Sequence, residues 1–192
     1  MNKHFITTSQ LQLDSFKLGE KIIKDDFKPD YLIALWRGGT SIAMYVHELL
    51  KYVYCIYIDH IAIRTSRYTG IDETLHEVQV HNLGYLLERL KKSDKILLVD
   101  DIWDTGLSIK AVIDTLHHKL GNNTPNDIRV ATVNYKPLRN KTTMKPHYFV
   151  NETNEWIVFS HELEGCTLDE IKQNWGIDIY NIVNHSLALQ NV

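Results

Sequence analysis

Two short, uninterrupted apolar runs, at residues 31–35 and 96–99, constrain the fold of this chain most strongly. Neither run alternates polar and apolar positions, which is typical of a strand buried on both faces of a parallel sheet. Each run leads into a segment with helix-like spacing, at about residues 40–51 and 108–120. The alternation of strands and helices predicts an α/β fold with a central, mostly parallel sheet flanked by helices.

Further segments extend this pattern along the chain. Residues 9–26 have apolar positions at helical spacing with Ser9 as a candidate cap, and Asn82 is a candidate cap for a helix ending near residue 91. Strands are expected at residues 53–58, 128–134, 148–150 and 156–159, with a long polar excursion at 62–80. No repeat or linker divides the 192 residues, so we expect one domain.

Composition argues against several classes of protein. The net charge of −3 argues against a protein that binds nucleic acid chiefly by neutralising its phosphates. No apolar run approaches the roughly 20 residues of a membrane span, and the N-terminus lacks the core of a signal peptide. The two cysteines, Cys55 and Cys166, lie far apart and predict a reducing cytoplasm without a disulfide framework.

The loop after residues 96–99 carries residues suited to phosphate binding. It reads Asp100-Asp101-Ile102-Trp103-Asp104-Thr105-Gly106-Leu107-Ser108 and joins a predicted strand to a predicted helix. Backbone amides at a helix N-terminus favour an anion, and a glycine lets the backbone come close to it. The tandem acids Asp100 and Asp101 suit ribose hydroxyls or a hydrated Mg²⁺. The alternative is a polar turn with a capping side chain, which the length of the run disfavours.

The first strand ends in a second glycine loop, Trp36-Arg37-Gly38-Gly39. Two glycines permit the close approach of a pyrophosphate, and the guanidinium of Arg37 offers fixed donors to its oxygens. In isolation, a tight turn with a solvated arginine is an equal alternative. Because ligands bind outside the carboxyl ends of parallel strands, we expect both loops to form one site.

The run at residues 99–108 resembles the signature of type I phosphoribosyltransferases, which bind phosphoribosyl pyrophosphate (PRPP). The resemblance implies that Asp100 and Asp101 contact the ribose hydroxyls and that Asp104, Thr105, Gly106, Leu107 and Ser108 wrap the 5′-phosphate. In purine enzymes of the family, the acid at Asp104 is also the proposed proton acceptor. Arg37, Gly38 and Gly39 resemble the pyrophosphate loop, where the family often has a non-proline cis peptide, here expected between Trp36 and Arg37.

A lysine–proline pair followed about twenty residues later by Trp-Ile resembles the xanthine-guanine and hypoxanthine branch of the family. Here the pairs are Lys136-Pro137 and Trp156-Ile157. The resemblance implies that Lys136 contacts the purine oxygen, that Trp156 stacks on the base, and that the backbone of Ile157 reads its edge. Taken singly, a strand-end lysine is more often a surface residue and a tryptophan a core residue. The family pattern breaks at Ser160-His161-Glu162, and neither these residues nor the tail at 163–192 receives a role.

Residues 64–75 resemble in position the mobile loop that closes over the reaction centre in this family. The family often has Ser-Tyr there, whereas this chain has Ser66-Arg67-Tyr68. Such closure would keep water from a cationic intermediate. The alternative is a polar loop in which Arg64 and Arg67 are solvated charges.

Together these features predict a Mg²⁺-dependent enzyme of purine salvage that transfers the phosphoribosyl group of PRPP to a 6-oxopurine, with Asp104 and Arg37 as catalytic residues. We expect a single domain over residues 1–192, with a hood at about residues 135–165 and the N-terminus as an additional contributor. We expect a cytoplasmic homo-oligomer, a dimer or tetramer, without nucleic-acid or membrane partners. Two alternatives remain: a phosphoribosyltransferase for another base, and a non-catalytic PRPP-sensing module.

Overall fold

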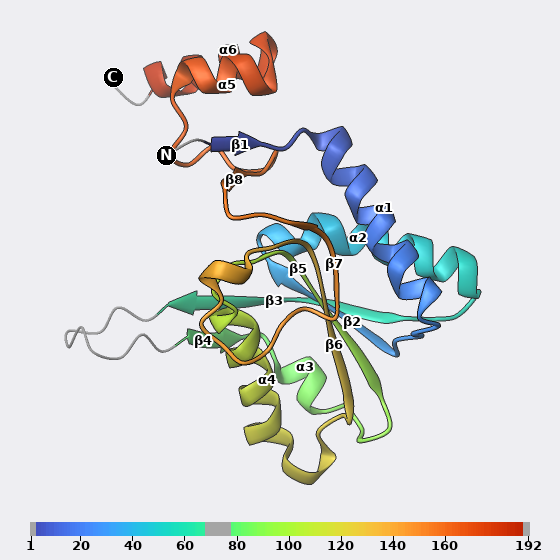
Figure 1. Ribbon diagram of the computed structural model, residues 1–192. Coiled ribbons are helices and arrows are strands. Elements are labelled where there is room, and N and C mark those ends of the chain that lie inside the picture. The colour runs from blue at the N-terminus through green and yellow to red at the C-terminus, as the bar shows by residue number, and fades with distance from the viewer. Residues whose placement is uncertain (1–2, 68–77, 190–192) are drawn as a thin grey trace, which may run out of the picture. The chain divides into compact units, whose positions relative to one another are not determined.

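The computed structural model describes residues 3–67 and 78–189, which fall into two compact units (Figure 1). The larger unit comprises Gln12–Asn154. The smaller unit joins Met1–Leu11 to Glu155–Val192. Of the residues expected in a hood, 135–154 group with the larger unit, whereas residues 155–165 and the N-terminal residues 1–11 group with the smaller one.

A six-stranded sheet in the order β4-β3-β2-β5-β6-β7 forms the centre of the larger unit. Its strands are β2 (Tyr31–Trp36), β3 (Asp59–Arg67), β4 (Val78–His81), β5 (Lys95–Trp103), β6 (Asp127–Tyr135) and β7 (Tyr148–Glu152). All neighbours are parallel except β3 and β4. The prediction of an α/β fold with a mostly parallel sheet is therefore confirmed.

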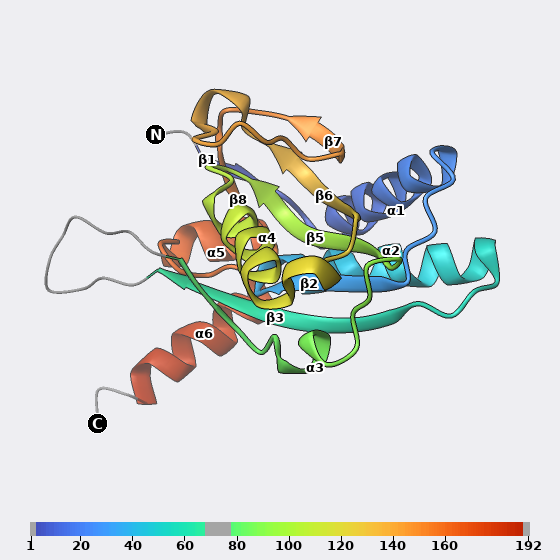
Figure 2. The ribbon, with the colours of Figure 1, turned by 90° about the horizontal axis from the view of Figure 1, so that it is seen from below.

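Helices cover both faces of this sheet (Figures 1 and 2). On one face, α3 (Gly84–Leu87) and α4 (Leu107–Leu120) pack over a core that includes Ile33, Leu98 and Val130. On the other lie α1 (Thr8–Lys24) and α2 (Gly38–Tyr54), and α2 contacts β2 and β5. Burial on both faces explains why residues 31–35 and 96–99 are continuously apolar.

Several boundaries of helices and strands in the structure differ from those predicted. Thr7, not Ser9, caps the first helix, since its hydroxyl accepts from the amide of Gln10 at 3.1 Å. The strand expected at residues 53–58 is wrong, because α2 continues through Tyr54 and ends at Cys55, whose φ is +53°. The strand begins only at Asp59. Apolar positions that suit a strand here continue a helix instead, because tertiary packing overrides β propensity.

The polar excursion at residues 62–80 is in part regular structure. Residues 64–67 pair with residues 78–81 in an antiparallel ladder, and the Ser66 hydroxyl hydrogen-bonds the His81 ring at 2.9 Å. Residues 68–77, with Tyr68, lie outside the described residues. The predicted loop therefore begins later than residue 64, because a pair of polar strands at a sheet edge lacks the apolar runs that mark buried strands. The helix expected from Asn82 to residue 91 is shorter, Gly84–Leu87.

The smaller unit is built on a parallel pair of short strands, β1 (Lys3–Phe5) and β8 (Trp156–Val158). The tail, to which no role was assigned from the sequence, forms α5 (Leu168–Trp175) and α6 (Ile177–Leu189). Thr167 and Glu170 make a capping box at the start of α5. Lys3 binds Glu170 at 2.8 Å, which ties the N-terminal strand to α5.

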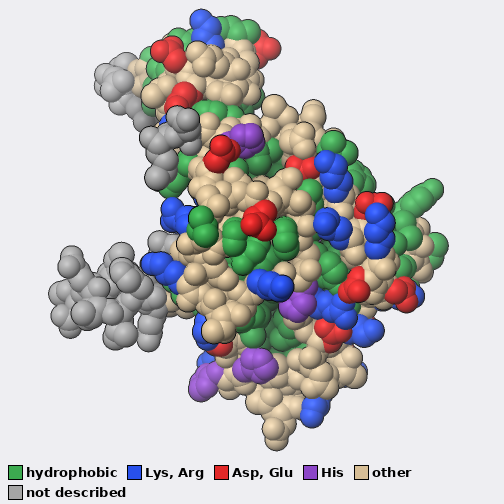
Figure 3. All heavy atoms as spheres, viewed as in Figure 1, with side chains coloured by type: hydrophobic (Ala, Val, Ile, Leu, Met, Phe, Trp, Pro, Cys, Tyr) green, Lys and Arg blue, Asp and Glu red, His purple; other side chains and the backbone are tan. Residues whose placement is uncertain are grey.

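The surface carries charges of both signs. On the face drawn in Figure 3, acidic and basic side chains of the described residues are interspersed. Among the described helices, none combines the length and apolarity that crossing a bilayer requires.

The contact between α2 and β5 predicts a strong effect of one methyl group. A Cβ on Gly39 would overlap the carbonyl oxygen of Val99 and lie 2.9 Å from the Cα of Asp100, both backbone atoms of β5. We expect Gly39→Ala to lower the free energy of unfolding by about 1–3 kcal/mol, because the helix and the strand must separate. Urea denaturation checks this.

The matched control is Gly84→Ala, since a Cβ on Gly84 would meet nothing within 4 Å. This helical substitution is expected to be neutral or stabilising by up to about 1 kcal/mol. Equal destabilisation by both substitutions would contradict the packing argument.

Candidate active site at the carboxyl ends of the strands

Three neighbouring strands end at one edge of the sheet and place the predicted loops together. β2 ends at Trp36, β5 at Trp103 and β6 at Tyr135, and Trp103 is paired with Tyr135. The loop after each strand carries predicted site residues, namely Arg37, Asp104 and Lys136. The expectation that these loops share one rim of the sheet is met because the strands are parallel and adjacent.

The loop after β2 is pressed against the acidic end of β5. The peptide bond between Trp36 and Arg37 is cis, where the family resemblance placed it. Gly38 and Gly39 are buried, while Arg37 is exposed. A Cβ on Gly38 would overlap the carboxylate of Asp101. The two glycines are therefore required for contact between the two loops, a role that the sequence reading, which assigned them to pyrophosphate, did not include.

Asp100 and Asp101 lie within β5 and so are held by the sheet. Asp100 pairs with Thr132 of β6, and its carboxylate accepts from the amide of Asp101 at 3.0 Å. Burial, followed by the charge of Asp101, raises the pKa of Asp100 well above its usual range. The two acids thus present crowded, poorly hydrated carboxylates, which a cation or ribose hydroxyls would stabilise.

The loop after β5 turns directly into α4. Gly106 adopts a left-handed conformation with φ +76° immediately before the helix, and a Cβ there would lie 2.6 Å from the indole nitrogen of Trp103. The first amides of α4, from Leu107 onward, have no helical partner because of their position. Thr105 and Ser108 flank them, both partly exposed. This arrangement suits a phosphate.

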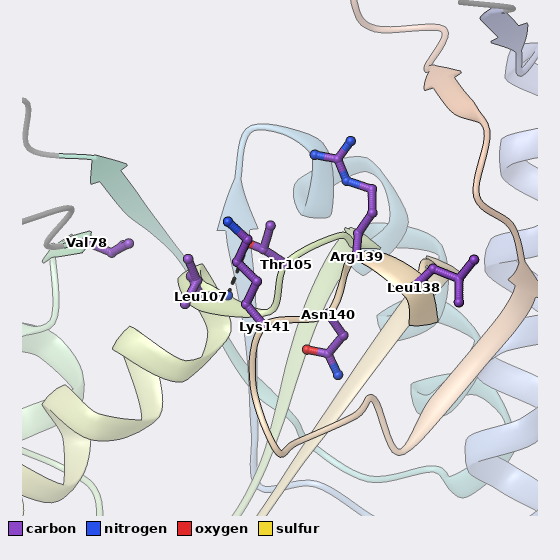
Figure 4. A pocket seen from close by; sticks show the side chains of 7 residues that line it. All are labelled: Val78, Thr105, Leu107, Leu138, Arg139, Asn140 and Lys141. Atoms are coloured by element: carbon purple, nitrogen blue, oxygen red, sulfur yellow. Dashed lines mark hydrogen bonds between the residues drawn. The ribbon is translucent and has the colours of Figure 1, made fainter.

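A cavity of about 500 Å³ opens beside this loop (Figure 4). It is lined by Val78, Thr105, Leu107, Leu138, Arg139, Asn140 and Lys141. In Figure 4 the side chains of Thr105, Arg139 and Lys141 are directed toward the same side. The cavity thus combines the predicted phosphate loop with two cationic side chains that the sequence reading did not select.

Asp104 lies between two cations. Its Oδ1 accepts from Nε of Arg139 at 2.6 Å, and its Oδ2 lies 3.6 Å from Nζ of Lys136. The side chain of Lys136 is only 4% exposed, so this predicted base-binding residue is far from an ordinary surface lysine. Arg139 went unnoticed in the sequence, although a basic residue two positions after Pro137 was the available signal.

The remaining predicted residues belong to other elements. Trp156 and Ile157 belong to the smaller unit, where they pair with Lys3 and His4. Trp156 is 48% exposed, which leaves its ring accessible, whereas the Ile157 side chain is buried. Ser66 and the backbone of Arg67 lie in β3. Among the described residues no three potential metal ligands of the His, Cys, Asp and Glu types gather.

The raised pKa of Asp100 predicts a pH-dependent effect of its removal. The folded chain holds the proton of Asp100 more tightly than the unfolded chain does, so this group lowers stability wherever it is ionised. We expect Asp100→Asn to stabilise the fold at neutral pH by about 0.5–2 kcal/mol. The gain should shrink as the pH falls towards the ordinary carboxyl range and vanish below it. Urea denaturation between pH 4 and 8, as a rough range around those values, checks this; a gain independent of pH would exclude the electrostatic cause.

Comparisons with known proteins agree with this geometry. Residues 9–165 match the family described as the phosphoribosyl transferase domain. The chain is similar to the hypoxanthine-guanine phosphoribosyltransferase of Staphylococcus aureus, with 25% identity over 162 residues and 83% of each chain covered. A protein of the same name from Lactococcus lactis is 26% identical over 149 residues, covering 77% of this chain and 75% of the relative.

The fold is also similar to a known crystal structure, that of the purine phosphoribosyltransferase from Pyrococcus horikoshii. The TM-score is 0.67 at 25% identity, and the superposition covers 87% of this chain and 99% of the other. The family match spans most of the chain and includes both glycine loops and Lys136. This chain belongs to the phosphoribosyl transferase domain family.

Proposed function

We propose that this protein transfers the 5-phosphoribosyl group of PRPP to a 6-oxopurine, giving a nucleoside 5′-monophosphate and pyrophosphate in purine salvage. The observation that carries the proposal is the pairing of Asp104 with the buried Lys136 beside the phosphate loop. Asp104 offers an acceptor for a ring N–H proton, and Lys136 offers a donor for the exocyclic 6-oxo group. Adjacent acceptor and donor groups match the edge of a 6-oxopurine, which presents both kinds of partner.

The known relatives support this choice of acceptor. The proteins from Staphylococcus aureus and Lactococcus lactis are named hypoxanthine-guanine phosphoribosyltransferases, and the Pyrococcus horikoshii protein is named a purine phosphoribosyltransferase. Burial of Lys136 supports it as well, because a desolvated ammonium makes a stronger and more selective hydrogen bond to a carbonyl oxygen.

The proposed reaction exchanges one bond at C1 of the ribose for another. The bond from C1 to the pyrophosphate oxygen breaks with its electron pair leaving on pyrophosphate, and a ring nitrogen of the base forms the new bond. Arg37 stabilises the leaving pyrophosphate, and the amides from Leu107 onward with Thr105 and Ser108 hold the 5′-phosphate. Asp104 accepts the proton that the base loses. Fixing two substrates on one rim supplies much of the rate.

Asp100 and Asp101 fit the Mg²⁺ that this family implies. Their carboxylates are adjacent, and burial together with mutual repulsion raises the pKa of Asp100, so a cation nearby would relieve both penalties. Mg²⁺ commonly binds through one or two carboxylates plus substrate phosphates and water, which suits a site with two acids. When bound, Mg²⁺ would neutralise charge on the pyrophosphate. The same two acids would hold the ribose hydroxyls.

The wider setting of the reaction is also part of the proposal. Trp156 and the Ile157 backbone would contact the base, with the smaller unit as the hood. Ser66 and Arg67, at the end of β3, would lead into a closing loop that includes Tyr68. We propose a homo-oligomer, dimer or tetramer, in the cytoplasm, where the free thiols of Cys55 and Cys166 persist.

A panel of bases tests the function directly. We expect the purified protein with PRPP and Mg²⁺ to release pyrophosphate with hypoxanthine, guanine or xanthine, and to release little with adenine, uracil or orotate. Chelation of Mg²⁺ with EDTA should abolish turnover, and excess Mg²⁺ should restore it. Pyrophosphate release and chromatography of the nucleotide product give the readout.

Two other outcomes would each support one of the alternative functions. Turnover only with a pyrimidine would agree with membership of the family but would show that the acceptor is not a 6-oxopurine. Tight PRPP binding by calorimetry without turnover on any base would indicate a sensing module in place of an enzyme.

Substitution of Asp104 tests the proton acceptor. We expect Asp104→Asn to lower kcat by about 10²–10⁴-fold, the usual contribution of a general base. The control is Asp114→Asn on α4, where an exposed carboxylate pairs with Lys110 at 2.5 Å. That variant should retain turnover, and unchanged turnover in Asp104→Asn would remove Asp104 from the mechanism.

A further inference from the structure

A short turn after β6 is organised around the side chain of Asn140. The carboxamide oxygen of Asn140 accepts from the indole of Trp103 at 3.2 Å, and from the amide and the hydroxyl of Thr142 at 3.1 and 2.9 Å. Its Nδ2 donates to the carbonyl of Met144 at 2.7 Å. These four hydrogen bonds fix the backbone on both sides of Lys141, which lies between Asn140 and Thr142.

The same turn is fastened to the phosphate loop. The amide of Lys141 donates to the carbonyl of Thr105 at 3.0 Å. Trp103, whose indole donates to Asn140, is buried against this loop, since a Cβ on Gly106 would lie 2.6 Å from its indole nitrogen. The backbone position of Lys141 beside Thr105 and Gly106 is therefore set by hydrogen bonds and by packing.

The Lys141 side chain lines the cavity of about 500 Å³ together with Thr105 and Leu107. In Figure 4 the side chains of Lys141 and Thr105 point toward the same side. Among the described lining residues there are two cations, Lys141 and Arg139, and no carboxylate. Arg139 is paired with Asp104 at 2.6 Å, whereas Lys141 forms no ion pair with any residue that the structure describes. The cavity therefore has a positive charge that this part of the chain does not balance.

We propose that Lys141 is a further ligand of the 5′-phosphate of PRPP. The amides from Leu107 onward and the hydroxyl of Thr105 offer neutral donors, and a helix N-terminus adds the equivalent of about +0.5 charge. A phosphate ester carries about −1.5 to −2 charges at neutral pH, so more than one negative charge stays unbalanced by the loop alone. One ammonium on an anchored backbone supplies the missing charge through a charge-assisted contact. This inference rests on the part of the proposed function that places a phosphate at this loop.

The order of the strands favours the 5′-phosphate over the pyrophosphate as the group that Lys141 contacts. Lys141 follows β6, and Arg37 of the pyrophosphate loop follows β2. Because β5 lies between β2 and β6 in the sheet, its phosphate loop separates the two segments. The anchor of Lys141 is Thr105, which belongs to that phosphate loop.

Calorimetry with ribose 5-phosphate tests the proposal, because this probe carries the 5′-phosphate without the pyrophosphate. We expect Lys141→Gln to raise the Kd for ribose 5-phosphate about 5- to 20-fold through loss of a charge-assisted contact. Lys141→Arg keeps the charge and should stay within about threefold of the unmodified protein. The control is Lys145→Gln, since Lys145 is also exposed but is not among the described residues that line the cavity. That variant should bind within about twofold of the unmodified protein.

Kinetics with PRPP and a purine give a second readout. The contact to the 5′-phosphate is present both before and during the bond exchange, so its loss removes binding energy equally from the two states. Lys141→Gln should therefore raise KM for PRPP about 5- to 20-fold and change kcat by less than about twofold. A fall in kcat with KM unchanged would place Lys141 in the chemical step and overturn the proposal.

The outcomes separate this inference from the proposed function. If Lys141→Gln weakens ribose 5-phosphate binding but the unmodified protein turns over no purine, the proposed acceptor is wrong and Lys141 is still a phosphate ligand. If a purine is turned over and Lys141→Gln binds ribose 5-phosphate as tightly as the unmodified protein does, the inference is wrong. Weaker binding of pyrophosphate alone would assign Lys141 to the leaving group and also overturn it. So would undetectable binding of both ribose 5-phosphate and PRPP by the unmodified protein.

Discussion

The parallel ladder that joins β2, β5 and β6 is the constraint on which the rest of this structure depends. Its register aligns Ala34 with Val99 and Trp103 with Tyr135, so three loops leave the sheet at one edge. The loops can meet there only because Gly38 and Gly39 present no side chain to β5. The backbone hydrogen bonds between these strands thus set where each loop leaves the sheet.

The charges at this edge divide the site into two parts. At one end, Asp100 and Asp101 crowd two carboxylates together, which raises the pKa of Asp100 and costs stability until a cation or ribose shares the charge. At the other end, Asp104 lies between Lys136 and Arg139, so its charge is balanced within the protein. The first part is suited to a cationic or hydroxylated ligand and the second to a ligand of mixed donors and acceptors. This division matches the two halves of a phosphoribosyl transfer, the sugar phosphate and the base.

The smaller unit shows how segments far apart in the sequence become one structure. Lys3 and Trp156 are partners in a parallel strand pair, and Lys3 also binds Glu170. Phe5 packs edge-on against Trp175 at a ring separation of 5.8 Å. None of these contacts leaves a periodic signal in the sequence, because two three-residue strands are too short to show one. The sequence analysis therefore included the N-terminus as a contributor to a hood but assigned no structure to the tail at residues 163–192, which forms α5 and α6 of the smaller unit.

The sequence by itself determined the fold class and the two glycine loops, because buried parallel strands need unbroken apolar runs and phosphate loops need particular residues in a fixed order. It also located Asp104 and Lys136 through short motifs whose order is visible in the chain. Only the tertiary structure decided that Gly38 packs against Asp101, that Lys136 is buried, and that Arg139 contacts Asp104. It also decided that residues 53–54 are helical and that 64–67 form a strand. The physical reason is the same in each case, because these properties depend on contacts between residues that are distant in sequence. A local sequence pattern reflects only the conformational preferences of residues that are close together in the chain.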